Sequence, residues 1–93
     1  MKITVKGFHQ FQKAMGNQAL LKMEVENSTI KEVLDNLSNR FGKEFKNLLL
    51  DPETGQTQKK VVILLNGVAH TYHLDTLLKD GDVIALFPVV SGG

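Results

Sequence analysis

The sequence predicts an α+β domain, in which a mixed four- to five-stranded sheet packs on one main helix. Apolar and polar residues alternate near the start of the chain, an apolar stripe of helical period follows, and two apolar runs of strand length come after it. Because the helix supplies a long crossover, the first and last strands can pair in parallel. The 93 residues are enough for one domain with one core. We expect residues 1–88 to form that domain and residues 89–93 to form a flexible tail.

The first part of the chain predicts two strands joined by a longer connection. The strands are expected over residues 2–8 and 20–25. In the first strand, Ile3, Val5 and Phe8 form the apolar set of a half-buried strand. The connection over residues 9–15 contains no helix breaker and predicts one or two helical turns.

The main helix is predicted to begin at Thr29 and to end at Gly42. Thr29 and Glu32 have the spacing of a capping box, in which each side chain satisfies the other residue's backbone N–H. Gly42 stands where a C-terminal cap is needed. The apolar stripe consists of Ile30, Val33, Leu34, Leu37 and Phe41. We interpret this stripe as core packing and not as a cofactor contact.

Short helical segments, turns and strands are predicted for the second half of the chain. Helical segments are expected over residues 44–50 and 75–79, strands over residues 61–65, 68–74 and 83–87, and turns over residues 51–55 and 80–82. Asn66-Gly67 is the strongest hairpin signal, because both residues tolerate the positive φ of a tight turn. Pro88 should end the last strand, since it has no backbone N–H to donate.

Two of these strands are apolar on both faces. A sheet that is covered on one side should alternate, but residues 61–65 and 83–87 do not. The side chains expected to face the helix are Ile63, Leu65, Ile84 and Leu86, and those expected to point away are Val62, Leu64, Ala85 and Phe87. The second set predicts an exposed apolar patch for a partner protein. The alternatives are a dimer interface and cover by residues 43–60.

The chain ends in two glycines. Gly92 and Gly93 have no side chains, so they can enter a narrow channel and leave the terminal carbonyl open to attack. A carboxylate is a poor electrophile, so its chemistry would need activation by another protein, as an acyl-adenylate made from ATP. Sulfide would then give a thiocarboxylate, and an amine would give an isopeptide. The alternative is an inert, frayed chain end.

The last 17 residues carry a family resemblance. The turn Asp80-Gly81-Asp82, the apolar strand after it, the pair Phe87-Pro88 and the final Gly92-Gly93 resemble the end of MoaD, the small subunit of molybdopterin synthase. Asn66-Gly67 and the connection after Phe8 also agree with that family. The chain is therefore identified as a member of the ubiquitin-like MoaD/ThiS sulfur carriers, closest to MoaD. The resemblance implies a ubiquitin-like β-grasp fold.

The resemblance also implies a mechanism and partners. An E1-like adenylating enzyme would use ATP to activate the Gly93 carboxylate, and a sulfur donor would convert it to a thiocarboxylate. Gly92 would give access to the reacting carbonyl. The sulfur would pass to an acceptor enzyme, in MoaD's case the molybdopterin synthase large subunit in molybdenum cofactor biosynthesis. Phe87 and Leu64 are expected to lead the docking surface. Its other expected members are Val62, Ala85, Pro88, Val89 and Val90.

Three departures from the MoaD pattern leave the acceptor open. Val89 replaces a second proline, Ser91 replaces alanine, and residues 43–60 are longer than in compact bacterial MoaD. Longer relatives include archaeal ubiquitin-like modifiers and carriers for cysteine or other metabolites. Conjugation to protein lysines is one alternative function, and a plain interaction domain with an inert tail is another.

Composition argues against several other functions. Eleven basic and ten acidic residues give a net charge of +1, which offers no case for a nucleic-acid or membrane partner. No apolar stretch reaches membrane-span length, no signal peptide is evident, and cysteine is absent, so we expect a cytoplasmic protein. His70 and His73 should lie on opposite faces of a strand, so we expect no metal site or cofactor. No nucleophile-and-base pattern is evident, so we do not expect an enzyme.

Overall fold

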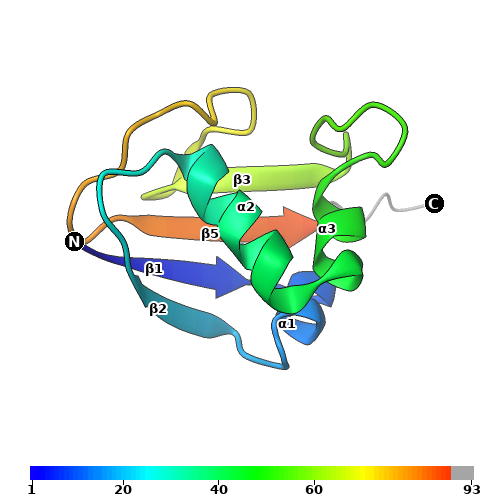
Figure 1. Cartoon of the computed structure of the whole chain (residues 1–93), viewed down its shortest axis with the longest axis horizontal. Coiled ribbons are helices and arrows are strands. Elements are labelled where there is room, and N and C mark those ends of the chain that lie inside the picture. Colours follow the sequence, from blue (N-terminus) through cyan, green and yellow to red (C-terminus); the bar gives the residue numbers. More distant parts are fainter. Residues whose placement is uncertain (89–93) are drawn as a thin grey trace.

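A mixed five-stranded sheet forms one layer of the computed structural model, which describes residues 1–88 (Figure 1). The strands are β1 (Lys2–Gly7), β2 (Leu20–Glu24), β3 (Val61–Leu65), β4 (Val68–Ala69) and β5 (Val83–Pro88). Their order across the sheet is β2-β1-β5-β3-β4. The central pair, β1 and β5, is parallel, and the other three pairs are antiparallel. This confirms the predicted β-grasp arrangement, in which the two ends of the domain meet at the centre of the sheet.

Three helices form the second layer. They are α1 (Gln10–Ala14), α2 (Ile30–Phe41) and α3 (Lys43–Leu49). The longest, α2, runs across one side of the sheet, and α1 and α3 lie at one end of it (Figure 1). All three were predicted, and α3 begins one residue earlier than expected.

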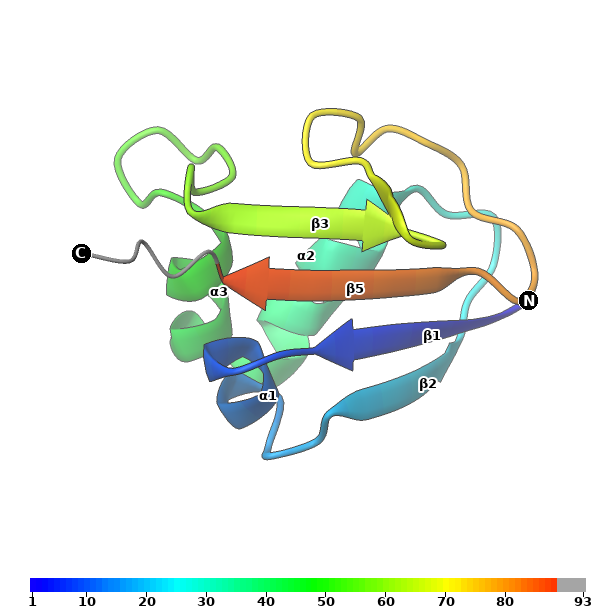
Figure 2. The same ribbon diagram turned by 180° about the vertical axis from the view of Figure 1, so that it is seen from behind.

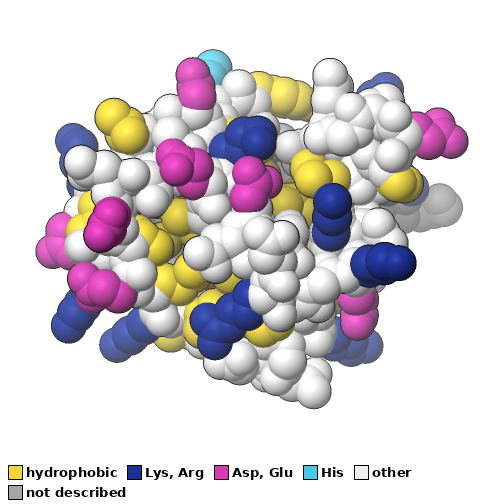
Figure 3. Space-filling model, in the orientation of Figure 1, with side chains coloured by type: hydrophobic (Ala, Val, Ile, Leu, Met, Phe, Trp, Pro, Cys, Tyr) yellow, Lys and Arg dark blue, Asp and Glu magenta, His cyan; other side chains and the backbone are white. Residues whose placement is uncertain are grey.

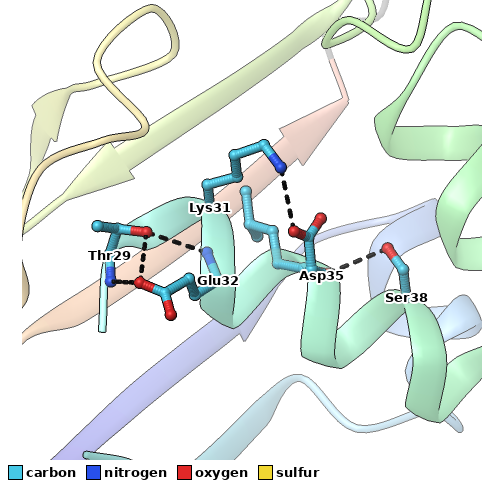
Figure 4. Close-up of polar contacts among 6 residues, drawn as sticks. Thr29, Lys31, Glu32, Asp35 and Ser38 are labelled. Carbon is cyan, nitrogen blue, oxygen red and sulfur yellow. Dashed lines mark hydrogen bonds and ion pairs between the residues drawn. The ribbon is translucent and has the colours of Figure 1, made fainter. Parts of the chain in front are cut away.

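Local signals at both ends of α2 act as the sequence indicated. Glu32 N–H donates to Thr29 Oγ1 at 3.2 Å, and Thr29 N–H donates to Glu32 Oε1 at 3.1 Å, which completes the capping box (Figure 4). Gly42 adopts a φ of 84°, a conformation that side chains disfavour, and its N–H donates to the Ser38 carbonyl. Residues at the two ends of α2 therefore define where the helix begins and where it ends.

The apolar stripe of α2 packs against alternate residues of the sheet. Its buried members are Ile30, Val33, Leu34 and Leu37. The buried strand residues in the same cluster include Ile3, Val5, Leu21, Met23, Ile63, Leu65, Ile84 and Leu86. Phe11 of α1 and Phe45 of α3 close one end of the core in an edge-to-face contact, with ring centroids 5.7 Å apart. The stripe is a core element, as predicted.

The predicted strand over residues 68–74 is wrong beyond Ala69. His70 N–H donates to the Ile63 carbonyl, but Ile63 N–H donates to the Thr71 hydroxyl at 3.0 Å instead of to a strand carbonyl. His73 N–H then bonds to the His70 carbonyl, which turns the chain away from the sheet. A side-chain hydroxyl thus replaces the next rung of the ladder.

The predicted helical turn over residues 75–79 is also wrong. This segment is extended where Leu77 forms an isolated antiparallel bridge with Thr29. Ile30 N–H donates to the Thr76 carbonyl and Lys31 N–H donates to the Leu74 carbonyl. These are among the first N–H groups of α2, which have no partner inside the helix. The segment therefore serves as part of the cap of α2 and not as a helix.

Candidate functional site

The face of the sheet opposite α2, here called the open face, carries the apolar residues expected to bind a partner. Figure 2 shows β1, β5 and β3 from this side with α2 behind them. Val62 lies opposite Phe87, and Leu64 lies opposite Ala85, so the four side chains form one cross-strand block. Val62, Leu64 and Phe87 are half-buried, and no helix of residues 1–88 lies over this face. The predicted orientation of β3 and β5 is therefore confirmed.

Ala85 differs from its expected exposure. It points to the open face as predicted, but it is only 9% exposed. Its neighbours across the strands are Leu64 on one side and Lys6 on the other, and both are larger. Ala85 therefore forms the floor of the patch, and Leu64, Val62 and Phe87 form its accessible part.

Phe8 belongs to this surface, although the sequence placed it with the core residues Ile3 and Val5. Its ring stacks on that of Phe87, with centroids 4.1 Å apart and planes 8° from parallel. Phe8 is half-buried, and its N–H donates to the Leu86 carbonyl. Its even position, shared with Lys2, Thr4 and Lys6, is the signal that could have placed it on the open face.

The chain after β1 is held in one conformation that orients Phe8. Phe11 N–H donates to the Phe8 carbonyl at 3.1 Å, which closes a tight turn, and His9 in that turn has φ 55° and ψ −119°. These angles are those of the first central residue of a type II′ turn, which is usually glycine. Gly7 fits closely, since a Cβ there would lie 2.6 Å from Met15 Sδ. The Phe8–Phe87 stack is thus built on a constrained backbone.

The patch lies beside the point where the described chain ends. Pro88, half-buried, is the last residue of β5 and lies opposite Val61. The other expected site residues follow it in the sequence and lie outside the described residues, as does the predicted flexible tail 89–93. They are Val89, Val90, Gly92 and Gly93. Phe87 and Pro88 connect the open face directly to these residues.

The polar groups near the other end of β5 serve the fold. Asn66 Nδ2 donates to Asp82 Oδ1, and Asn66 Oδ1 accepts from Val83 N–H, both at 2.9 Å. Asp82 also accepts from Lys79 N–H, and Asp80 accepts from Lys2 N–H. The two aspartates are therefore turn residues, as predicted, and they fix the register of β5 against β1 and β3.

The histidines are arranged differently from the prediction. His70 and His73 lie in the loop after β4, not on opposite faces of a strand, and their ring centroids are 6.3 Å apart. His70 Nδ1 lies 3.0 Å from the Val68 carbonyl. Among residues 1–88, no three histidine, aspartate or glutamate side chains gather as a metal site would require. The same residues contain no helix long and apolar enough to cross a membrane.

The helix side carries a separate hollow of about 380 Å³ (Figure 3). It lies among α2, the end of α3 and the loops around residues 55–57 and 71–74, with Leu34, Leu49 and Leu74 in its wall. Lys31 Nζ and Asp35 Oδ2 line it as well and pair at 3.1 Å, so their charges compensate each other (Figure 4). We assign it no part in the chemistry of the chain end.

Comparisons with known proteins agree with the fold. The model of the ThiS family matches residues 5–93. Small archaeal modifier protein 3 of Haloferax volcanii is 28% identical over the full length of both chains. The crystal structure of SAMP1 from the same organism superposes with a TM-score of 0.84 at 26% identity, again over both whole chains. A Pyrococcus furiosus structure named for molybdopterin converting factor subunit 1 is 27% identical, with a TM-score of 0.71, covering 97% of this chain and 99% of that one.

Proposed function

Because the chain belongs to the ThiS family of ubiquitin-like sulfur carriers, we propose that it carries sulfur as a thiocarboxylate on Gly93. Members of this family are small carriers or modifiers that work with E1-like activating enzymes, and they are not themselves catalytic. The observation that carries the proposal is the apolar patch on the open face, which includes Phe87 near the end of β5, so that only Pro88 and residues 89–91 separate it from Gly92 and Gly93 in the sequence. A partner bound to this face can hold the chain end in its own active site.

The proposed chemistry takes place in the partner. One oxygen of the Gly93 carboxylate attacks the α-phosphorus of ATP, pyrophosphate leaves, and an acyl-adenylate forms. Hydrosulfide then attacks the carbonyl carbon, the C–S bond forms as the C–O bond to AMP breaks, and AMP leaves. The carrier contributes no general base to these steps. Its contribution is to be recognised and to present a carbonyl that side chains do not shield.

The docking surface that we propose for the activating enzyme is centred on Phe87 and Leu64. Val62 and Phe8 extend it, Ala85 is its floor, and Pro88, Val89 and Val90 lead from it toward the chain end. Aromatic residues such as the Phe8–Phe87 pair suit the centre of an interface, because they bury a large area with few torsions to restrict.

Two acceptors for the activated chain end follow from specific observations. The Phe87-Pro88 pair and the similarity to the Pyrococcus furiosus structure favour a molybdopterin synthase large subunit, and hence molybdenum cofactor biosynthesis. The full-length similarity to the Haloferax volcanii modifier favours conjugation to lysine side chains of other proteins. Both routes share the adenylate, so activation is the step to test first.

The test is the intact mass of the protein after incubation with an E1-like enzyme, ATP and sulfide. A gain equal to replacing one oxygen by sulfur, located at Gly93 and lost in a variant ending at Ser91, is the expected result. No gain, with the same enzyme shown to charge another carrier, would refute the sulfur proposal for that pair. Lysine-linked adducts formed without sulfide would favour the modifier function.

A further inference from the structure

The open face has a second half, which differs in character from the apolar patch. On β1 and β2 the residues that point to this face are Lys2, Thr4, Lys6, Leu20, Lys22 and Glu24. Lys6 lies beside Ala85 of the patch, and Thr4 lies between Lys22 and Val83. The apolar patch of β3 and β5 therefore has a basic margin along β1 and β2.

Two lysines of this margin, Lys6 and Lys22, form no ion pair within the described chain. Neither of the two ion pairs among residues 1–88 involves Lys6 or Lys22, and both lysines are exposed. They occupy diagonal positions across β1 and β2, which places their Cα atoms roughly 7–8 Å apart with both side chains on one face. Glu24 is the acidic residue among these strand positions, and its carboxylate pairs with the N-terminal ammonium group of Met1 at 3.2 Å.

Charged side chains are distributed differently on the helix side of the molecule. Figure 3 shows lysine and arginine side chains interspersed with aspartate and glutamate over the helices. The Lys31–Asp35 pair on α2 is one case in which opposite charges meet directly. With a net charge of only +1 for the chain, the basic margin of the open face is a local feature and not a consequence of an overall basic composition.

We propose that Lys6 and Lys22 select an activating enzyme whose docking surface has carboxylates beside its apolar centre. This inference rests on the proposed function, since it names the chemistry of the partner at the same face. A carboxylate opposite each lysine would relieve the repulsion between the lysines and would fix the register of docking. Charges at the margin of an interface act mainly on encounter and specificity, and the apolar centre supplies most of the affinity.

The test compares charge-reversal variants in the sulfur-charging reaction. Lys6→Glu/Lys22→Glu should raise the KM for the carrier by about tenfold or more and leave kcat near the wild-type value. Lys6→Gln/Lys22→Gln should have a smaller effect. Raising the salt concentration to about 0.5 M should reduce the difference between wild type and both variants. Unfolding curves recorded by circular dichroism check that each variant is folded.

The control is Lys43→Glu, which reverses the charge of one lysine on the helix side. Lys43 is exposed at the first residue of α3, where a carboxylate is favourable to the helix, so its KM should not change. If the charge-reversal variant keeps the wild-type KM while Phe87→Ala raises it, the lysine proposal is refuted and the docking face stands. An equal rise in KM for Lys43→Glu would also refute the lysine proposal. If the wild-type protein accepts no sulfur, the proposed function fails and this inference fails with it.

Discussion

Replacing His9 with glycine should make the domain more stable. His9 holds φ 55° and ψ −119° in the turn closed by Phe8 and Phe11, a conformation open to glycine and strained for residues that carry a Cβ. The imidazole forms no hydrogen bond within residues 1–88, so nothing in the described fold offsets the strain. Alanine at this position would keep the Cβ and therefore the strain.

The size of the effect follows from two opposing terms. Relief of a side chain from a sparsely populated backbone region is worth about 1–3 kcal/mol. Glycine also gives the unfolded chain more freedom, which costs about 0.4–1 kcal/mol. The free energy of unfolding of His9→Gly should therefore rise by about 1 kcal/mol, and Tm should rise by about 4–8 °C for a domain of this size. His9→Ala should lie within about 0.5 kcal/mol of the wild-type protein.

The assay is denaturant and thermal unfolding followed by far-UV circular dichroism, since the chain has no tryptophan. Asn17→Gly is a matched control, because Asn17 also has a positive φ, of 63°, but asparagine tolerates the left-handed region. Its stability should change by only a few tenths of a kcal/mol, about the difference expected between glycine and a tolerated residue. A His9→Gly protein no more stable than His9→Ala would show that the turn at Phe8 is not strained and would refute this reasoning.

Three further changes test the packing that supports the open face. Leu37→Ala removes a fully buried side chain of α2 and should lower the free energy of unfolding by about 2–5 kcal/mol in denaturant titrations; a loss below about 1 kcal/mol would mean that the core there refills readily. Thr29→Ala removes the capping hydroxyl and should cost about 1 kcal/mol, visible as a lower Tm, whereas an unchanged Tm would show that the cap is redundant. Gly7→Ala places a Cβ 2.6 Å from Met15 Sδ and 3.2 Å from the backbone N of Gln12, so it should cost about 1–3 kcal/mol. Shortening the Met15 side chain as well should not restore the lost stability, because the close contact with the Gln12 backbone remains. Full recovery of stability in the double variant would contradict this explanation.

Much of the fold was predictable because its signals are local. The capping box of Thr29 and Glu32 and the stripe from Ile30 to Phe41 define α2 through contacts three and four residues apart. Asn66-Gly67 specifies the turn after β3 in the same way, and both residues adopt the expected positive φ. The apolar runs over residues 61–65 and 83–87 predicted an exposed apolar patch, because alternation was missing on both strands, β3 and β5.

The chain end was a prediction of a different kind. Gly92 and Gly93 suggest chemistry because they have no side chains to shield the terminal carbonyl. Their role rests on the family and on the proposed function. The structure adds the surface beside them, which joins Phe8 from β1 to Phe87 from β5. No sequence pattern indicates this pair, because Phe8 and Phe87 are 79 residues apart in the chain, although their ring centroids are only 4.1 Å apart in the fold.

Local signals in the chain were sufficient to predict the main helix, the main turns and the residues available for an apolar face. The end of β4, the capping of α2 by residues 74–78, and the burial of Ala85 beside the more accessible Leu64 depend on tertiary contacts. Each of the first group depends on neighbours in the chain, which the sequence gives directly. Each of the second depends on which hydrogen-bonding group or side chain another part of the fold supplies, such as the Thr71 hydroxyl from the loop after β4 at Ile63, or Lys6 of β1 beside Ala85. Cross-strand register supplies those neighbours, and register forms only when the sheet assembles.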